Sequence, residues 1–321
     1  MFKFRAPQKI FQIGKAKVGG QPGQLPTVLI GTIFYLGQRI VKDEKKGVFD
    51  KGEAEKLLNT QDEISDLTGN PCGVDIVATT VDSALKYIDF VSEVTDSIIS
   101  FDAWLPKVRI AALKHIAEVG LADRTIYNSI MSTPPPKEDE IDAIRESKVK
   151  AAILLAYNVK DRTPRGVISI LRGTEEQKSL LEMAEEAGIE KPLVDTTLFT
   201  FIPSIGAGAK ACFFVKEELG LPVGGSPGNA ASVWNEAKAW GTDVFKACWA
   251  SAEVVPLVLG GDYLLYGPIG SASYVIPTCA AIDAMIATSA IVDFGIKPLA
   301  KEHPLYKLFP EFVEKLEKAA L

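Results

Sequence analysis

The sequence predicts an α/β protein whose strands close into a (β/α)8 TIM barrel. Eight short β-rich runs alternate along the chain with amphipathic segments, and alternating units of this number close most economically into a barrel. Residues 151–157 are almost wholly apolar, as expected for a strand that is covered on both faces. An open doubly wound sheet is the alternative, but no G-x-G-x-x-G opens a helix after the first strand.

The elements follow from local signals taken in order. The expected strands are 27–30, 72–78, 97–101, 124–127, 151–157, 193–195, 222–225 and 263–266. Asp50 and Glu53 form a capping box that begins the clearest helix, and Gly69 ends it. Further helices are expected at 81–94, 106–119, 137–147, 174–188, 204–219, 230–259 and 274–294. For the helix at 174–188, Thr174 and Gln177 supply the expected capping box.

No linker is long or polar enough to divide the chain, so we expect a single domain over residues 1–321. Residues 1–20 alternate around Gly14 and Lys15, which predicts a hairpin over the N-terminal mouth of the barrel. The barrel itself is expected over residues 21–300, and a C-terminal helical tail over residues 301–321.

Composition and charge exclude several classes of function. The net charge is −6, so a nucleic acid is not an expected partner. Four scattered cysteines form no CxxC and no secretory signal opens the chain, which indicates free thiols in a reducing cytoplasm. Two histidines supply no zinc set and no Ser-His-Asp hydrolase. The apolar stretch 274–294 carries Asp283 in its middle, so we interpret it as a buried helix rather than a membrane span.

Polar side chains follow five consecutive strands of the expected barrel. These residues are Asp102, Asn128, Asn158, Asp195 and Asn229. The carboxyl ends of barrel strands form the functional face of this fold, so the five are expected to meet there. Carboxylates accept paired hydrogen bonds from a cyclic amidine, and amides both donate and accept. The set therefore suits a ring that displays donors and acceptors together.

Each of the five, taken singly, is as often a helix cap or turn residue as a binding residue. Only the set as a whole indicates a binding site, because a row of caps does not explain an asparagine inside the tight strand exit 126–129 (IYNS).

Several segments spread along the chain are similar to one protein family. They are 19–23 (GGQPG), 26–35 (PTVLIGTIFY), 43–50 (DEKKGVFD), 68–71 (TGNP), 118–124 (EVGLADR), 126–129 (IYNS) and 260–268 (GGDYLLYGP). In these segments the chain resembles the H subunit of tetrahydromethanopterin S-methyltransferase. The resemblance implies a pterin-binding barrel like that of dihydropteroate synthase, working in the one-carbon metabolism of methanogenesis.

The resemblance also implies a reaction and a site. The methyl group on N5 of a methyl-tetrahydropterin, either tetrahydromethanopterin or tetrahydrofolate, would pass to cob(I)alamin carried by a corrinoid protein, with no metal bound by this chain. Asp102, Asn128 and Asp195 match pterin-holding positions, and Asn229 matches the asparagine that faces N5. We expect the protein to form a homodimer. We also expect it to be cytoplasmic and to join a membrane-associated complex only through other subunits.

One segment departs from the family pattern. The aspartate that ends the third strand is followed there by small hydroxyl residues and glycine, whereas this chain has Asp102 followed by Ala103, Trp104, Leu105 and Pro106. A large indole near the site would favour the alternative of a non-catalytic paralogue that binds a pterin or docks a corrinoid protein. A third interpretation, dihydropteroate synthesis, needs basic residues for a diphosphate leaving group, and 224–229 (GGSPGN) offers none.

Overall fold

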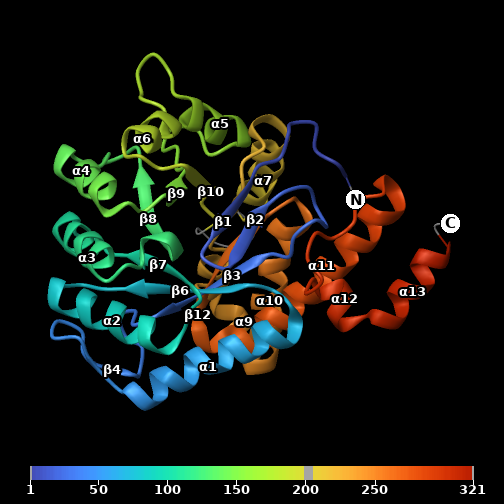
Figure 1. The fold of residues 1–321 in the computed structure, drawn as a ribbon, viewed down its shortest axis with the longest axis horizontal. Helices are drawn as coiled ribbons and strands as arrows, with labels where there is room; N and C mark the ends of the chain where they lie inside the picture. Colours follow the sequence, from blue (N-terminus) through green and yellow to red (C-terminus); the bar gives the residue numbers. More distant parts are fainter. Residues whose placement is uncertain (1, 199–204, 320–321) are drawn as a thin grey trace.

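Eight parallel strands close into a barrel in the computed structural model, which describes residues 2–198 and 205–319 (Figure 1). The barrel strands are β3 (Val28–Ile33), β6 (Cys72–Val77), β7 (Ile98–Asp102), β8 (Thr125–Met131), β9 (Ala151–Leu155), β10 (Lys191–Asp195), β11 (Val223–Gly225) and β12 (Tyr263–Pro268). They pair in chain order, and β12 closes on β3. The TIM barrel and all eight predicted strands are thus confirmed.

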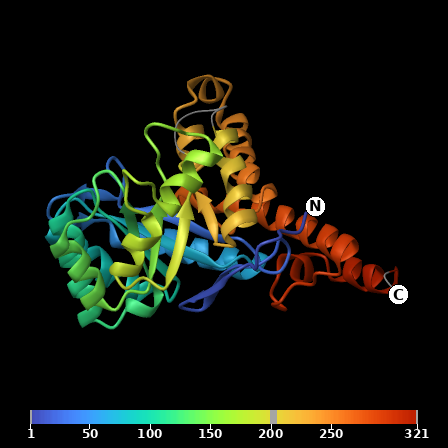
Figure 2. The same cartoon turned by 90° about the horizontal axis from the view of Figure 1, so that it is seen from above.

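Helices follow the strands and surround the barrel (Figures 1 and 2). They are α1 (Lys51–Thr68), α2 (Val81–Val94), α3 (Pro106–Glu118), α4 (Glu138–Ser147), α5 (Pro164–Arg172), α6 (Leu180–Glu186), α7 (Ile205–Leu219), α8 (Gly228–Ser232), α9 (Asn235–Ala239), α10 (Thr242–Val258), α11 (Ala272–Phe294), α12 (Pro304–Leu308) and α13 (Pro310–Ala319). A small antiparallel pair, β4 (Val41–Asp43) and β5 (Val48–Phe49), lies between β3 and α1. Helix α13 extends away from the barrel (Figure 2).

The N-terminal hairpin closes the N-terminal mouth of the barrel, as predicted. Strand β1 (Ile10–Ile13) pairs with β2 (Ala16–Gly19) across the turn at Gly14. Ile13 and Val18 pack with the apolar residues that begin several barrel strands, Ile98 and Ile126 among them. The Gly14 N–H also donates to the Asp123 carbonyl at 3.0 Å. The opposite, carboxyl ends of the strands are thereby left open for binding residues.

Two helix predictions are corrected. Residues 230–259 form not one helix but α8, α9 and α10, and the break before α10 falls at Gly241, whose φ of +108° lies outside the helical region.

Thr174 and Gln177 do not cap a helix; they form an isolated antiparallel bridge. Helix α6 instead begins after Ser179, whose hydroxyl accepts the first free N–H groups. Helix α5 was not predicted, and Ser204 lies outside the described residues.

Helix α11 is apolar but belongs to the core. Of the described residues, only Ile269–Phe294 is long and apolar enough to cross a membrane, and half of its best window is buried in the protein. The Asp283 carboxylate accepts hydrogen bonds from the Thr27 N–H at 2.8 Å and from Asn70 Nδ2 at 2.6 Å. These contacts tie the helix to the start of β3, which favours the interpretation as a buried helix.

Candidate functional site

A buried carboxylate, Asp75, links four neighbouring strands inside the barrel. Ser100 on β7 donates its hydroxyl to Asp75 Oδ1 at 2.7 Å, and Thr32 on β3 donates to Oδ2 at 3.2 Å. Asn128 Nδ2 on β8 donates to Oδ1 at 3.3 Å. Burial raises the pKa of Asp75, and these three donors oppose the rise because they stabilise the charged form. We call Thr32, Asp75, Ser100 and Asn128 the Asp75 cluster.

Asp102 lies beside this cluster. It ends β7 and pairs in register with Asn128 on β8, so the two predicted residues are neighbours at the carboxyl edge. Burial above all, and then the nearby Asp75 carboxylate, raise the pKa of Asp102 to about 7, against the opposing field of the Arg109 guanidinium. With its pKa near 7, the Asp102 carboxyl is only partly ionised at neutral pH.

Asp195 occupies the end of β10 and is buried. Its Oδ1 accepts the Thr197 N–H at 2.6 Å, which orients the carboxyl in the strand exit. Burial raises the pKa of Asp195 to about 7, although the Thr197 N–H favours the charged form. A Cβ at Gly225 of β11 would lie 2.9 Å from Asp195 Oδ1, so only glycine leaves room for this carboxyl.

Asn229 is the second residue of α8, the short helix that follows β11 after a turn at Ser226 and Pro227. Its N–H donates to the Ser226 carbonyl at 3.1 Å, and its carbonyl accepts the Ser232 hydroxyl at 2.8 Å. These bonds define the turn through the backbone, and the residue is exposed. The side-chain amide therefore remains available to a ligand at the edge of the barrel.

Asn158 differs from the other four. Its Oδ1 accepts the N–H groups of Lys160 and Asp161 at 3.0 Å each, and its Nδ2 donates to the Gly166 carbonyl at 3.1 Å. The amide thus shapes the loop between β9 and α5, as expected for a turn residue. The structure does not place it in contact with the Asp75 cluster, and its role in binding a pterin stays a prediction.

Trp104 lies on the loop between β7 and α3. Its side chain is 88% exposed, so the indole does not fill the space at the ends of the strands. The backbone beneath it is fixed by Arg109, whose Nη1 donates to the carbonyls of Ala103 at 2.7 Å and Trp104 at 3.0 Å. Arg109 Nε also donates to Glu140 Oε1 of α4 at 2.5 Å. The departure from the family pattern therefore changes the outer surface of this loop.

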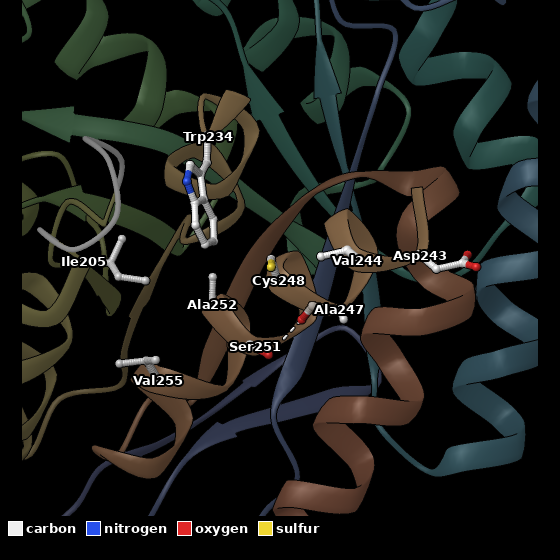
Figure 3. A pocket seen from close by; sticks show the side chains of 9 residues that line it. All are labelled: Ile205, Trp234, Asp243, Val244, Ala247, Cys248, Ser251, Ala252 and Val255. Atoms are coloured by element: carbon white, nitrogen blue, oxygen red, sulfur yellow. Dashed lines mark hydrogen bonds between the residues drawn. The ribbon is translucent and has the colours of Figure 1, made fainter. Parts of the chain in front are cut away.

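A separate groove of about 620 Å³ runs along the outer face of α10 (Figure 3). Apolar side chains dominate its lining, among them Ile205, Trp234, Val244 and Val255. None of the five predicted residues lines it. Its apolar lining offers few partners to a polar heterocycle, so the polar strand ends remain the candidate site.

Asp75 was not predicted from the sequence. It lies in the middle of β6, between the fully buried Val74 and Ile76. The predicted set contains only residues that follow strands, whereas Asp75 is inside one. A lone carboxylate in a run of buried apolar residues needs hydrogen-bond partners, and a search for such residues inside strands would have found it.

The residues at the strand ends combine acids that can change charge near neutral pH with amides that both donate and accept. An ionised Asp102 or Asp195 accepts two hydrogen bonds from adjacent N–H groups of a ligand, whereas the neutral form offers one donor. Within residues 2–198 and 205–319, no three His, Cys, Asp or Glu side chains are placed to hold a metal ion. The residue types of the site suit an organic ring with both donors and acceptors.

Comparison with solved structures identifies the barrel. Dihydropteroate synthase from Yersinia pestis, solved with a pterin–sulfa conjugate, superposes with a TM-score of 0.58 at 13% identity, over 86% of this chain and 99% of that chain. The enzyme from Xanthomonas albilineans in complex with 7,8-dihydropteroate gives 0.53 at 18% identity, over 81% and 92%. At such identities the likeness establishes the fold.

Sequence comparison identifies the family. The H subunit of tetrahydromethanopterin S-methyltransferase from Methanopyrus kandleri is 42% identical over 316 residues, which cover 92% of this chain and 96% of that protein. Its counterpart from Methanothermobacter thermautotrophicus is 41% identical over 314 residues, 96% of this chain and all of that protein. The family model described as the tetrahydromethanopterin S-methyltransferase MtrH subunit matches residues 6–299. The chain therefore belongs to the family of the H subunit of this methyltransferase.

Proposed function

We propose that this protein transfers the N5-methyl group of a methyl-tetrahydropterin to cob(I)alamin carried by a partner corrinoid protein. The observation that carries the proposal is the arrangement at the strand ends. Asp102 and Asn128 pair in register, Asp195 is buried two strands farther along the barrel, and Asn229 presents a free amide. This set complements the amidine N–H groups, the carbonyl and the amine of a reduced pterin.

The transfer balances as a nucleophilic displacement. The partner's cobalt(I) centre supplies the electron pair that forms the new bond to the methyl carbon. The bond between that carbon and N5 breaks, N5 keeps its electron pair, and a proton from solvent joins N5. The cobalt is oxidised by two electrons and its methyl-bearing form leaves with the partner. This chain holds the pterin and stabilises the change at N5.

The residues divide that work. Asp102 and Asp195, when ionised, hold the N–H groups of the ring, and Asn128 is oriented for the same ring by its bond to Asp75. Asn229 donates its amide N–H to N5, where negative charge develops as the methyl group leaves. A hydrogen bond that strengthens only in the transition state raises the rate without tightening binding of the substrate. A neutral amide suffices because solvent supplies the proton.

The proposal also extends to partners and location. A corrinoid protein is required as the methyl acceptor, and the relatives are named as one subunit of a larger enzyme. We propose assembly with other subunits and with a second copy of this chain, in the cytoplasm or at the periphery of a membrane complex. Tetrahydromethanopterin and tetrahydrofolate are both candidate donors, because the ring that they share meets the same side chains.

An anaerobic assay tests this function. The protein is mixed with methyl-tetrahydromethanopterin, or in parallel with methyl-tetrahydrofolate, and with reduced cobalamin, and the loss of the Co(I) absorption band is followed. Methylation with either donor supports the proposal. Measurable pterin binding without methylation, including with a purified corrinoid protein, would overturn it and support a non-catalytic paralogue.

The matched variants are Asn229→Ala and Asn235→Ala. Both asparagines are exposed and lie in neighbouring short helices, but only Asn229 lies in the first helix after β11. We expect Asn229→Ala to lower turnover more than pterin affinity and Asn235→Ala to leave both unchanged. Equal losses of turnover and affinity in Asn229→Ala would limit its role to binding.

A further inference from the structure

A glutamate that no step of the proposed function uses is buried beneath the turn of Asn229. Glu253 lies on α10, and its relative exposure is 0%. Neither Oε1 nor Oε2 has a hydrogen-bond partner among the described residues. A buried carboxyl group without partners is unfavourable for folding, so its presence calls for a reason other than stability.

The groups around Glu253 are uncharged at neutral pH. The Trp249 indole lies one turn earlier on the same helix and donates to the Tyr266 carbonyl at 3.2 Å. Tyr266 on β12, and Tyr274 and Cys279 on α11, are the titratable groups that face it, and each has a raised pKa because of burial and the nearby Glu253 carboxyl. No cation is among these groups. Burial raises the pKa of Glu253 well above its usual value, opposed by the approach of the Trp249 indole and the Gly228 N–H.

Close contacts connect this carboxyl to the turn that carries Asn229. A Cβ at Gly228 would lie 2.9 Å from Glu253 Oε1 and 2.7 Å from Trp249 Cζ2. A Cβ at Gly267 of β12 would likewise lie 2.8 Å from Trp249 Cζ2. Glu253 and Trp249 therefore form a tight support under the backbone of Gly228. Asn229 is the next residue, so movement of this support displaces its amide.

We propose that Glu253 is a positioning residue whose buried carboxyl, together with Trp249, holds the Gly228 turn so that the Asn229 amide meets N5 of the pterin. The inference rests on the proposed function for the role of Asn229. The physical reason is that an uncharged side chain of this shape fits beneath Gly228, whereas a charged side chain draws in water and displaces the turn. Ionisation of Glu253 therefore lowers kcat.

The first test does not depend on activity. A carboxyl with a raised pKa keeps its proton in the folded state over a pH range in which the unfolded state loses it, so stability falls as pH rises through that range. The melting temperature of the wild-type protein should therefore fall relative to that of Glu253→Gln between about pH 5 and about pH 8. Parallel curves for the two proteins would show that Glu253 is not held neutral and would overturn the inference.

The second test separates positioning from general packing. At neutral pH, Glu253→Gln should retain kcat within about twofold, because the amide keeps both the shape and the lack of charge. Glu253→Ala, which removes the support, should lower kcat about tenfold while the KM for the pterin changes less than about twofold. The exposed Glu236→Gln on α9 serves as the matched control and should match the wild type.

The pH profile adds a signature that a packing role alone does not produce. The wild type should lose kcat on the alkaline side, and Glu253→Gln should not. Identical alkaline limbs would overturn the inference, as would an equal rise in KM in Glu253→Ala. If Glu253→Ala does not fold, the comparison of the wild type with Glu253→Gln still decides. If the wild type transfers no methyl group, the proposed function fails, whereas the melting curves still report on Glu253.

Discussion

Under the proposed function, Asp195 should make pterin binding depend on pH. Burial moves its pKa from 3.8 to about 7, which corresponds to about 4 kcal/mol in favour of the neutral acid in the free protein. In the proposed binding mode a pterin donates two N–H groups to Asp195, and only the ionised carboxylate accepts both. Affinity is therefore present above the folded pKa and is lost as pH falls through about 7. At about pH 6 only one molecule in about eleven is ionised at this position, so titration of Asp195 alone should make affinity about tenfold weaker than at about pH 8, and titration of Asp102 should add to this loss.

Titration calorimetry of methyl-tetrahydropterin at both pH values measures this change. Asp195→Asn should bind about 2–3 kcal/mol more weakly at high pH and lose its share of the pH dependence. Asp102 titrates in the same range, so the measurement is repeated with the Asp102→Asn protein. The pH dependence that remains in this variant gives the contribution of Asp195. The exposed Asp66→Asn on α1 is the control. Equal wild-type affinity at the two pH values, or an unchanged slope in Asp195→Asn, would refute the reasoning.

Three further substitutions test separate parts of the structure. Asn229→Ala should lower kcat about a hundredfold, or about 3 kcal/mol of transition-state stabilisation, with pterin affinity nearly unchanged in calorimetry. Lys216 Nζ lies 2.7 Å from Asp262 Oδ1, so Lys216→Met leaves this carboxylate without its cation. The substitution should lower the free energy of unfolding, measured in urea, by about 3–5 kcal/mol. A loss below about 1 kcal/mol would contradict this prediction. Trp104→Ala should change pterin affinity less than about twofold, since the indole is 88% exposed. A larger loss of affinity would place the indole in the binding site.

Local signals along the chain were enough to predict the barrel. Periodicity, caps and glycine stops each act over a few residues, so the eight strands and the hairpin at Gly14 could be predicted without any tertiary contact. The same reasoning failed at Thr174, where a cap signal was satisfied by a β-bridge, and at Gly241, where a long apolar helix is broken. In both places a local pattern was compatible with two conformations.

The geometry of the candidate site was predicted in part, for a related reason. Asp102 and Asn128 follow strands that any parallel barrel brings to one edge, so topology alone makes them neighbours. Asp75 was missed because its partners Thr32 and Ser100 lie 43 and 25 residues away along the chain. Nothing near Asp75 in the sequence shows that three donors converge on it.

The residue types at the strand ends, and the barrel that gathers them, are properties of the sequence itself. Tertiary structure alone decides how those residues behave. Asp195 titrates near neutral pH and Glu253 has no hydrogen-bond partner among the described residues because of what surrounds them, and the surrounding groups come from distant parts of the chain. Removal of water from a charged group depends on every atom that covers it, whereas helix caps and strand periodicity depend on neighbours in the chain.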